Sequence, residues 1–310
     1  MRHNYTVWIL PLIAISGLLL FLPAPDFVIT HWHHHVWDLG HVLLFSGWSV
    51  VLLTLLHSRG VTKTRQWLFI LIFTLATGSA IEIIQMGLNR EASLFDLFLD
   101  LCGALITLCF FTAFQVRPTK PLACSCLVIA GLTVAALASH RLAASLYDKY
   151  ALIKQFPVLI SAQSPLELNR LYGKPERYFA PNAINDIPAI GINFTTDRYS
   201  LIYMIDFPGN WSEYQYLKIQ LHVSHNEPLP AVLSIEDAEH RSRGTRSSDR
   251  FNLRLILKPG SNLLNIPLDQ VRQAPRERTL DVSQITRVNL YTMSLANPRM
   301  VYLKEIRLEQ

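Results

Sequence analysis

The chain has 310 residues, of which 50% are hydrophobic and 16% are charged, and it carries a formal net charge of +5. This modest and dispersed charge argues against a nucleic-acid-binding surface, so no nucleic-acid partner is expected. The four cysteines all lie between residues 102 and 126, which excludes a disulfide framework for the C-terminal half. Long apolar runs end near residue 140, and charges, prolines and alternating patterns follow.

Five apolar runs predict an α-helical bundle of about five transmembrane spans. Each run approaches the roughly 20 residues that a helix needs to cross the hydrocarbon core of a bilayer. The first run could be a signal peptide, but it ends in a poor cleavage site and four more runs follow, so it is interpreted as a retained helix. The runs cover residues 7–22, 36–56, 66–86, 95–114 and 121–139.

Basic residues give the predicted orientation. If five helices alternate across the membrane, six basic residues lie on one side, whereas Arg90 and Arg141 lie on the other. The positive-inside rule then places the N-terminus in the cytoplasm and everything after the fifth helix outside. The six residues on the cytoplasmic side are Arg2, Arg59, Lys63, Arg65, Arg117 and Lys120.

The loop before the second predicted helix contains a run of histidines, residues 31–35, interrupted by one tryptophan. If that helix begins early, His34, Asp38 and His41 share one face, and imidazoles this dense can bind a divalent metal. The alternative is an interfacial loop whose histidines face headgroups and solvent. No cofactor is otherwise expected.

Polar residues gather at the outer ends of the second, third and fourth predicted helices. Ionisable groups are costly in a membrane and are functional candidates by default. Spacings of three or four residues place each pair on one helix face. The sequence therefore predicts a cluster at one depth, made of Asp38 and His41, Glu82 and Gln85, Arg90 and Ser93, and Asp96 and Asp100.

Three interpretations of this cluster stay open. In a binding site, Arg90 would hold a phosphate or carboxylate with its planar fork, assisted by Gln85, Ser93, Asp38 and Asp100. In an enzyme, Glu82 or Asp96 would act as a base and His41 as an acid. The cluster is otherwise a buried ion-pair network that only holds three helices together.

The same residues carry a resemblance to the VanZ-like family, over about residues 7–115. The matching motifs are Glu82-x-x-Gln85, Arg90-x-x-Ser93-x-x-Asp96 with Gly103, and Leu39-Gly40-His41. The departures are Trp37 and Asp38 in place of an acidic–basic pair, Asp100 in place of an asparagine, and Thr107 in place of a glycine. The family is named for a protein of resistance to the antibiotic teicoplanin. The resemblance implies a multi-pass protein of the bacterial inner membrane with a role in the cell envelope, and it implies no particular reaction.

The C-terminal half is expected to form an all-β antiparallel sandwich over residues 166–310, joined by a linker over residues 142–165 to a membrane domain over residues 1–141. Alternating apolar residues predict strands that are buried on one face, and about seven strands argue for a sandwich. The pattern resembles galactose-binding-like jelly rolls. The alternating sets begin with Leu201, Tyr203, Ile205 and Phe207, continue through residues 217–223, 251–257 and 264–268, and end with 288–290 and 301–308.

Two features of this half suggest a ligand. Trp211 and Tyr214 follow a turn, where exposed rings would stack on sugar faces, although such aromatics more often cap the core. The basic stretch 241–246 is read as a mobile loop, either solvated or in contact with an acidic glycan or lipid headgroup. No catalytic pattern is found here.

Three functions follow from these observations. The favoured one is a membrane protein that binds an anionic amphiphile, such as a lipid-linked glycan, with its periplasmic or extracellular domain contacting carbohydrate. The second is an intramembrane acid/base enzyme acting on a lipid-linked or phosphorylated substrate. The third is a structural anchor of the envelope.

Overall fold

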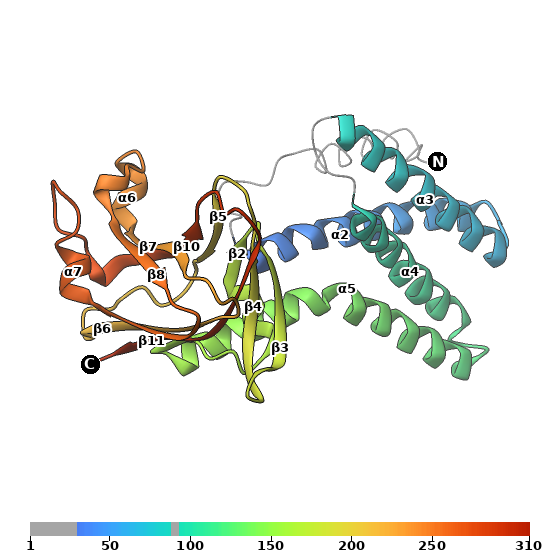
Figure 1. Ribbon diagram of the computed structural model, residues 1–310. Helices are drawn as coiled ribbons and strands as arrows, with labels where there is room; N and C mark the ends of the chain where they lie inside the picture. Colours follow the sequence, from blue (N-terminus) through green and yellow to red (C-terminus); the bar gives the residue numbers. More distant parts are fainter. Residues whose placement is uncertain (1–29, 88–92) are drawn as a thin grey trace. The chain divides into compact units, whose positions relative to one another are not determined.

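The computed structural model describes residues 30–87 and 93–310 (Figure 1). The chain divides into two compact units, Met1–Ala143 and Ala144–Gln310, and each is described by itself. The predicted first span, residues 7–22, and Arg90 lie outside the described residues.

Four helices occupy the described part of the first half, namely α2 (His31–Ser58), α3 (Lys63–Gly87), α4 (Leu94–Val116) and α5 (Pro121–Gln155). Each is long and apolar enough to cross a membrane. They coincide with the second to fifth predicted spans, so a membrane protein is supported and the number of about five spans stays a prediction. Helix α2 begins at His31, so the histidine run is helical and the expectation of a loop there is wrong.

Local signals explain where these helices begin and end. Ser93 caps α4, because its hydroxyl accepts a hydrogen bond from the backbone N–H of Asp96 at 3.1 Å. Asp96 lies in the first turn, where a negative charge is favoured by the helix dipole. Gly60, with φ of 71°, follows the end of α2 in the left-handed conformation that terminates helices.

Helices α2 and α4 cross at Gly103. A β-carbon built there would lie 2.4 Å from the carbonyl oxygen of Val42, so only glycine permits this approach. The Ser46 hydroxyl donates to the carbonyl oxygen of Gly103 at 3.0 Å, which fixes the crossing. Large apolar side chains such as Leu43 and Ile83 remain exposed on these helices, as lipid-facing positions would be.

The second unit is an antiparallel sandwich of two sheets. Sheet A has the strand order β3-β4-β11-β6-β9, with β1 also paired to β11, and sheet B has the order β2-β5-β10-β7-β8. The strands of sheet A are β1 (Val158–Ile160), β3 (Glu176–Ile184), β4 (Ile187–Phe194), β6 (Tyr216–Val223), β9 (Gly260–Pro267) and β11 (Arg299–Glu309). Those of sheet B are β2 (Leu171–Gly173), β5 (Ser200–Met204), β7 (Leu229–Asp237), β8 (Phe251–Leu257) and β10 (Ile285–Thr292).

One hydrophobic core joins the inner faces of the two sheets, so the expected antiparallel β domain is present. Residues such as Ile192 and Leu221 from sheet A pack with Leu233 and Val288 from sheet B. The alternation of apolar residues slips once between Leu303 and Ile306, and the pairing of β11 with β6 shifts register there, as a β-bulge produces.

The predicted inward face of β5 is wrong. Ile202 and Met204 point into the core, whereas Leu201 and Tyr203 lie on the opposite face. Both faces of this strand carry apolar residues, so alternation did not identify the buried one. This reversal matters for function, because the outer face of sheet B holds a pocket.

Regular structure also occupies residues 142–165, where the sequence pattern predicts a linker. The final turns of α5 and strand β1 lie there, and Leu159 and Ile160 are fully buried in the sandwich core. Asp148 of α5 receives three hydrogen bonds of 2.7 to 3.1 Å from the buried guanidinium of Arg170. This segment therefore belongs to the sandwich fold.

Short helices complete the second unit. They are η2 (Pro165–Arg170), α6 (Ala238–Ser242), η3 (Ser247–Asp249), α7 (Leu268–Arg272) and η4 (Val282–Gln284). The last of these lies just before β10. Helix α6 follows directly after β7, so it places its side chains at one end of sheet B.

Candidate functional site

The polar cluster of the helical unit centres on a buried imidazole–carboxylate pair. The Nδ1 atom of His41 on α2 lies 2.8 Å from Oδ1 of Asp100 on α4, and its Nε2 atom lies 3.9 Å from Oδ2 of Asp96. A β-carbon at Gly78 on α3 would lie 2.7 Å from Oδ2 of Asp100, so this glycine makes room for the carboxylate. Three helices therefore converge on one histidine and its two acids.

Glu82 on α3 links the end of one helix to the beginning of the next. Its Oε2 atom accepts a hydrogen bond of 2.6 Å from the backbone N–H of Ser93, the cap of α4. Its Oε1 atom is buried and has no hydrogen-bond partner among the described residues. A buried acceptor without a partner is costly in an apolar setting, and a proton or a ligand donor would relieve that cost.

The structure brings together five of the residues predicted from sequence: His41, Glu82, Ser93, Asp96 and Asp100. Glu82 lies close enough for its charge to act on both His41 and Asp100. Their roles as catalytic or ligand-binding residues stay predictions.

Of the three other residues predicted for this cluster, the structure describes two. Asp38 is half-buried and contacts His35 at 3.5 Å. Gln85 is buried on α3, three residues beyond Glu82. Arg90, the expected anion-binding group, lies outside the described residues, so the described cluster is rich in carboxylates.

The described part of the chain does not favour the predicted metal site at His34, Asp38 and His41. No three histidine, cysteine, aspartate or glutamate residues in that part come close enough together to hold a metal ion. His34 is exposed, while His41 is buried and engaged with Asp100. The helical spacing was right, but the imidazoles face different surroundings.

The two aromatic residues proposed as a sugar platform do not form one. Trp211 is fully buried, and its Nε1 atom donates to the carbonyl oxygen of Pro208 at 3.0 Å, so its exposure was wrongly expected. Tyr214 packs against the core, with its ring edge-on to Phe156 at 5.6 Å between centroids. Both residues stabilise the sandwich.

A pocket of about 360 Å³ lies instead on the outer face of sheet B. Residues of β5, β10 and β7 form its floor, and helix α6 with the following loop contributes to its rim. The strand register explains the arrangement, because Asn289 lies opposite Tyr203 on one side and opposite Ser234 on the other. The lining residues are Tyr199, Leu201, Ser234, Glu236, His240, Arg241, Thr245, Arg250, Arg287, Asn289 and Tyr291.

The pocket floor is polar, buried and internally hydrogen-bonded. The Asn289 amide donates to the Ser234 hydroxyl at 2.9 Å and to Oε1 of Glu236 at 3.0 Å. Arg250 donates to the same carboxylate oxygen at 2.6 Å, and Arg287 donates through Nε to Oδ1 of Asn289 at 2.8 Å. Such a network holds its side chains in fixed directions before any ligand arrives.

Tyrosine rings flank this floor. Tyr199 is 56% exposed, and its ring lies edge-on to that of Tyr291 at 6.4 Å between centroids. Tyr203 stacks on Tyr172 at 5.5 Å, and the guanidinium of Arg287 lies 3.7 Å above the Tyr203 ring. The outer face of sheet B therefore combines ring surfaces with fixed hydrogen-bonding groups.

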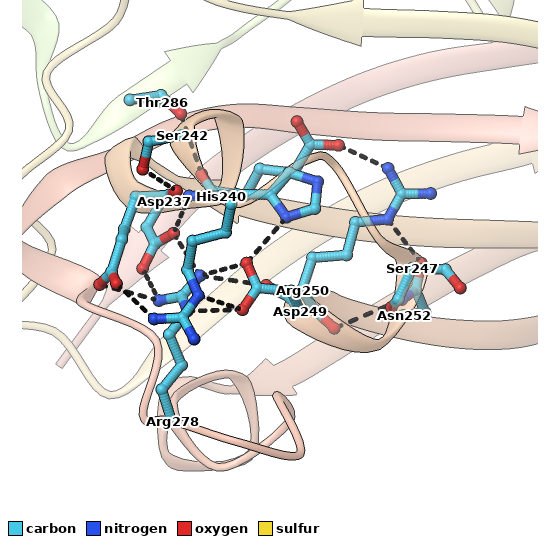
Figure 2. Close-up of polar contacts among 12 residues, drawn as sticks. Asp237, His240, Ser242, Ser247, Asp249, Arg250, Asn252, Arg278 and Thr286 are labelled. Atoms are coloured by element: carbon cyan, nitrogen blue, oxygen red, sulfur yellow. Dashed lines mark hydrogen bonds and ion pairs between the residues drawn. The ribbon is translucent and has the colours of Figure 1, made fainter.

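An ion network next to the pocket fixes the end of β7 (Figure 2). Arg278 donates to the carboxylates of Asp237 and Asp249, each at 2.8 Å, and Asp249 also contacts Nδ1 of the pocket residue His240 at 3.2 Å. Burial would raise the pKa of Asp237, but hydrogen bonds from Arg278 and from the backbone outweigh it and lower that pKa. The hydrogen bonds of Arg278 likewise hold the pKa of Asp249 below its usual value.

Sequence reasoning missed the pocket because it treated the polar positions of these strands as solvent-facing. Ser234 and Asn289 each lie between apolar core residues, and Glu236 follows one, as in any strand with one exposed face. The available signal was weak: a helix and a long loop follow β7, and such an insertion covers polar positions that would otherwise meet water.

Comparisons with known proteins add little to this picture. No protein-family model matches the chain, and no curated protein matches it. Solved structures align with the C-terminal half. A family 11 carbohydrate-binding module from Clostridium thermocellum, in complex with a mixed-linked tetrasaccharide, is 12% identical over 49% of this chain and 94% of its own, with a TM-score of 0.39.

Two further structures behave in the same way. The family 11 module of the cellulosomal cellulase Lic26A-Cel5E of Clostridium thermocellum is 12% identical, covering 45% of this chain and 85% of its own, with a TM-score of 0.34. An agarase is 10% identical over 49% of this chain and 24% of its own, with a TM-score of 0.39. At these scores the alignments carry no inference about function, and the chain is a protein with four apolar, membrane-length helices and an antiparallel two-sheet domain in its described part.

Proposed function

We propose that this chain is a multi-pass membrane protein that binds a saccharide in the pocket on sheet B. The observation that carries this proposal is the buried Ser234–Asn289–Glu236 network on the pocket floor, bordered by tyrosine rings. Buried groups with fixed directions are typical of small-molecule sites, where they set the orientation of the ligand.

The chemistry of the pocket suits a sugar. A saccharide ring offers hydroxyl groups that both donate and accept hydrogen bonds, together with C–H faces that pack on aromatic rings. Arg250 and Arg287 supply donors, Ser234 supplies a hydroxyl, and Tyr199 offers an exposed ring. At about 360 Å³ the pocket has the size of known small-molecule sites.

The helical unit gives the proposal its setting. Its carboxylate cluster, together with Arg90 and Gln85, fits the VanZ-like resemblance and a role at the outer face of a bacterial inner membrane. We propose that it holds the polar end of an amphiphile such as a lipid-linked glycan, in which case the periplasmic or extracellular sandwich binds the sugar part. The arrangement of charges on opposite sides of the spans supports this orientation.

Binding to a glycan array tests the proposal. Full-length protein in detergent should bind a subset of saccharides, and Tyr199→Ala should weaken that binding by about fivefold or more, since loss of one stacked ring costs about 1 kcal/mol. Tyr178→Ala is the matched control, because this partly exposed tyrosine lies on sheet A. Equal binding by both variants, or no binding by the wild type, would refute the proposal.

A second function, intramembrane acid/base catalysis, is favoured by one observation. The Oε1 atom of Glu82 is buried without a partner in the described residues, and the His41–Asp100 pair lies within the same cluster. If this site is catalytic, Glu82→Gln should retain a lipid substrate that wild-type protein converts, as native mass spectrometry would show. A variant that only melts earlier, with no change in bound lipid, would instead indicate a structural anchor.

A further inference from the structure

The pocket on sheet B has an excess of positive charge that its own acid does not balance. Three arginines line it, Arg241, Arg250 and Arg287, against the single carboxylate of Glu236. Three further acids lie nearby, and each is already bound: Asp237 and Asp249 by Arg278, and Glu239 by Arg243. The charge that faces the pocket is therefore positive.

The carboxylate of Glu236 already accepts hydrogen bonds from other side chains of the protein. Its Oε1 atom accepts from Arg250 at 2.6 Å and from Asn289 at 3.0 Å, and its side chain is largely buried. Arg250 and Glu236 therefore neutralise each other. Arg241 and Arg287 are left without a carboxylate partner among the residues that the structure describes.

Arg287 is held ready for a planar anion. Its guanidinium lies 3.7 Å above the Tyr203 ring, and its Nε atom donates to Asn289. The two terminal nitrogens make no hydrogen bond to described residues. A guanidinium fixed by stacking loses little entropy when it binds, and its fork matches a carboxylate or phosphate.

Arg241 adds a second charge from the rim. It lies on α6 and is exposed, whereas the neighbouring Arg243 pairs with Glu239 at 2.8 Å. No ion pair of Arg241 occurs in the described part of the chain. Two unpaired arginines around one concave site create a potential that attracts anions.

We infer that the pocket selects saccharides that carry an oxyanion, either the carboxylate of a uronic acid or a phosphate ester. This inference rests on the proposed saccharide function and names the class of sugar. The tyrosine rings and the neutral floor bind the sugar ring, while Arg241 and Arg287 bind the anionic substituent. Neutral sugars accept hydrogen bonds but bring no negative charge to either arginine, so they bind more weakly.

The test compares charged and neutral sugars of matched shape. Full-length protein in zwitterionic nanodiscs is titrated calorimetrically with trigalacturonate and its methyl ester, and with maltotriose phosphate and maltotriose. We expect at least one charged sugar to bind about tenfold more tightly than its neutral partner. Its advantage should fall as salt is raised, because screening weakens contacts between charges. Which pair shows the difference distinguishes a carboxylate from a phosphate.

Arginine variants locate the effect. Arg241→Gln should remove most of the preference, measured as the ratio of the affinities for the charged and the neutral sugar. Arg287→Gln should act in the same direction. Arg272→Gln, an exposed arginine of α7 that does not line the pocket, is the control.

The outcomes distinguish a failure of the proposed charge selectivity from a failure of the proposed saccharide binding. Equal affinity for charged and neutral sugars would refute the proposed selectivity but not saccharide binding. The same holds if Arg241→Gln and Arg272→Gln lose equal amounts of the preference for the charged sugar. If none of the four sugars nor any array glycan binds, both ideas fail.

Discussion

Arg278 joins two carboxylates of the sandwich unit that come from different segments of the chain. It comes from the segment before β10 and reaches Asp237 at the end of β7 and Asp249 before β8. Its side chain is 9% exposed and that of Asp237 is fully buried. A buried carboxylate that loses its charge partner is strongly destabilising, so this arginine supports the whole end of the sheet that carries the pocket rim.

Acid should weaken this network. The pKa of Asp237 and that of Asp249 are both lowered in the folded state, so the network stabilises the fold above the unfolded value of about 3.9 and loses that effect as pH falls through the folded values. Arg278→Gln should therefore destabilise the unit by about 3 kcal/mol at pH 7, and by less at pH 3, which lies below the unfolded value. Amide hydrogen exchange of β7, measured at both pH values, checks this.

The surface pair of Arg272 and Asp269 supplies the control for that experiment. These side chains are exposed, and an exposed pair contributes little. Arg272→Gln should leave exchange in β7 unchanged at either pH. If the penalty of Arg278→Gln were the same at pH 3 as at pH 7, charge pairing would not be its cause.

The sequence predicted which residues form the polar cluster of the helices better than it predicted which of them pair. The spacing of His41, Asp96 and Asp100 predicted that they belong to one cluster, and the structure places them together. That His41 selects Asp100 depends on Gly78 making room, which no helical period reveals. Trp211 was expected to be exposed and is buried, because a turn beside an aromatic residue does not reveal whether its ring points into the core.

Among the elements, the crossing of α2 and α4 depends on one small residue. Gly103→Val would push side-chain atoms against the backbone of α2, where a β-carbon alone would lie 2.4 Å from the carbonyl oxygen of Val42. Backbone cannot move as a flexible side chain can, so we expect a loss of about 1–3 kcal/mol, as for other overpacked cores. Thermal unfolding in detergent, followed by circular dichroism, should show an earlier transition.

Gly47→Val provides the matched helix substitution. Gly47 also lies within a membrane helix, but nothing lies within 4 Å of a β-carbon built there. This variant isolates the intrinsic effect of exchanging glycine for valine in a helix. Equal melting of the two variants would show that the close approach at Gly103 contributes no stability.

Element positions followed well from sequence where one pattern dominated. Apolar runs located α2 to α5, and alternation located β6, β8 and β10. The sequence pattern did not reveal β1 to β4, because these strands carry irregular burial and bulges, such as the register shift within β3. The end of α5 extends beyond the apolar run because its polar residues, such as Asp148, find partners in the sandwich.

At the scale of the whole molecule, the two halves differ in their surroundings: the helices suit a lipid bilayer and the sandwich suits water. The first exposes apolar side chains along its helices, whereas the second buries its apolar residues in one core and has polar strand faces. The charge pattern predicts which side of the membrane each connection faces, and it predicts that the sandwich lies outside the cytoplasm.

Reporter fusions check that orientation. Alkaline phosphatase joined after Gln310 should be active and a green fluorescent protein at the same place dark, because the first folds only outside the cytoplasm and the second only inside. Fusions after Gly60, in the basic connection between α2 and α3, should give the opposite pattern. Fluorescence of the fusion at Gln310 would contradict the predicted topology.

The position of β11 has a consequence for how the sandwich is made. It lies inside sheet A, paired with β4, β6 and β1, yet it leaves the ribosome after every other described strand. Until it arrives, β4 and β6 present unpaired edges of the kind that recruit other chains. The nascent domain therefore remains open until β11 has been made, and a chain that stops before Arg299 is expected to be an aggregation-prone fragment instead of a smaller sandwich.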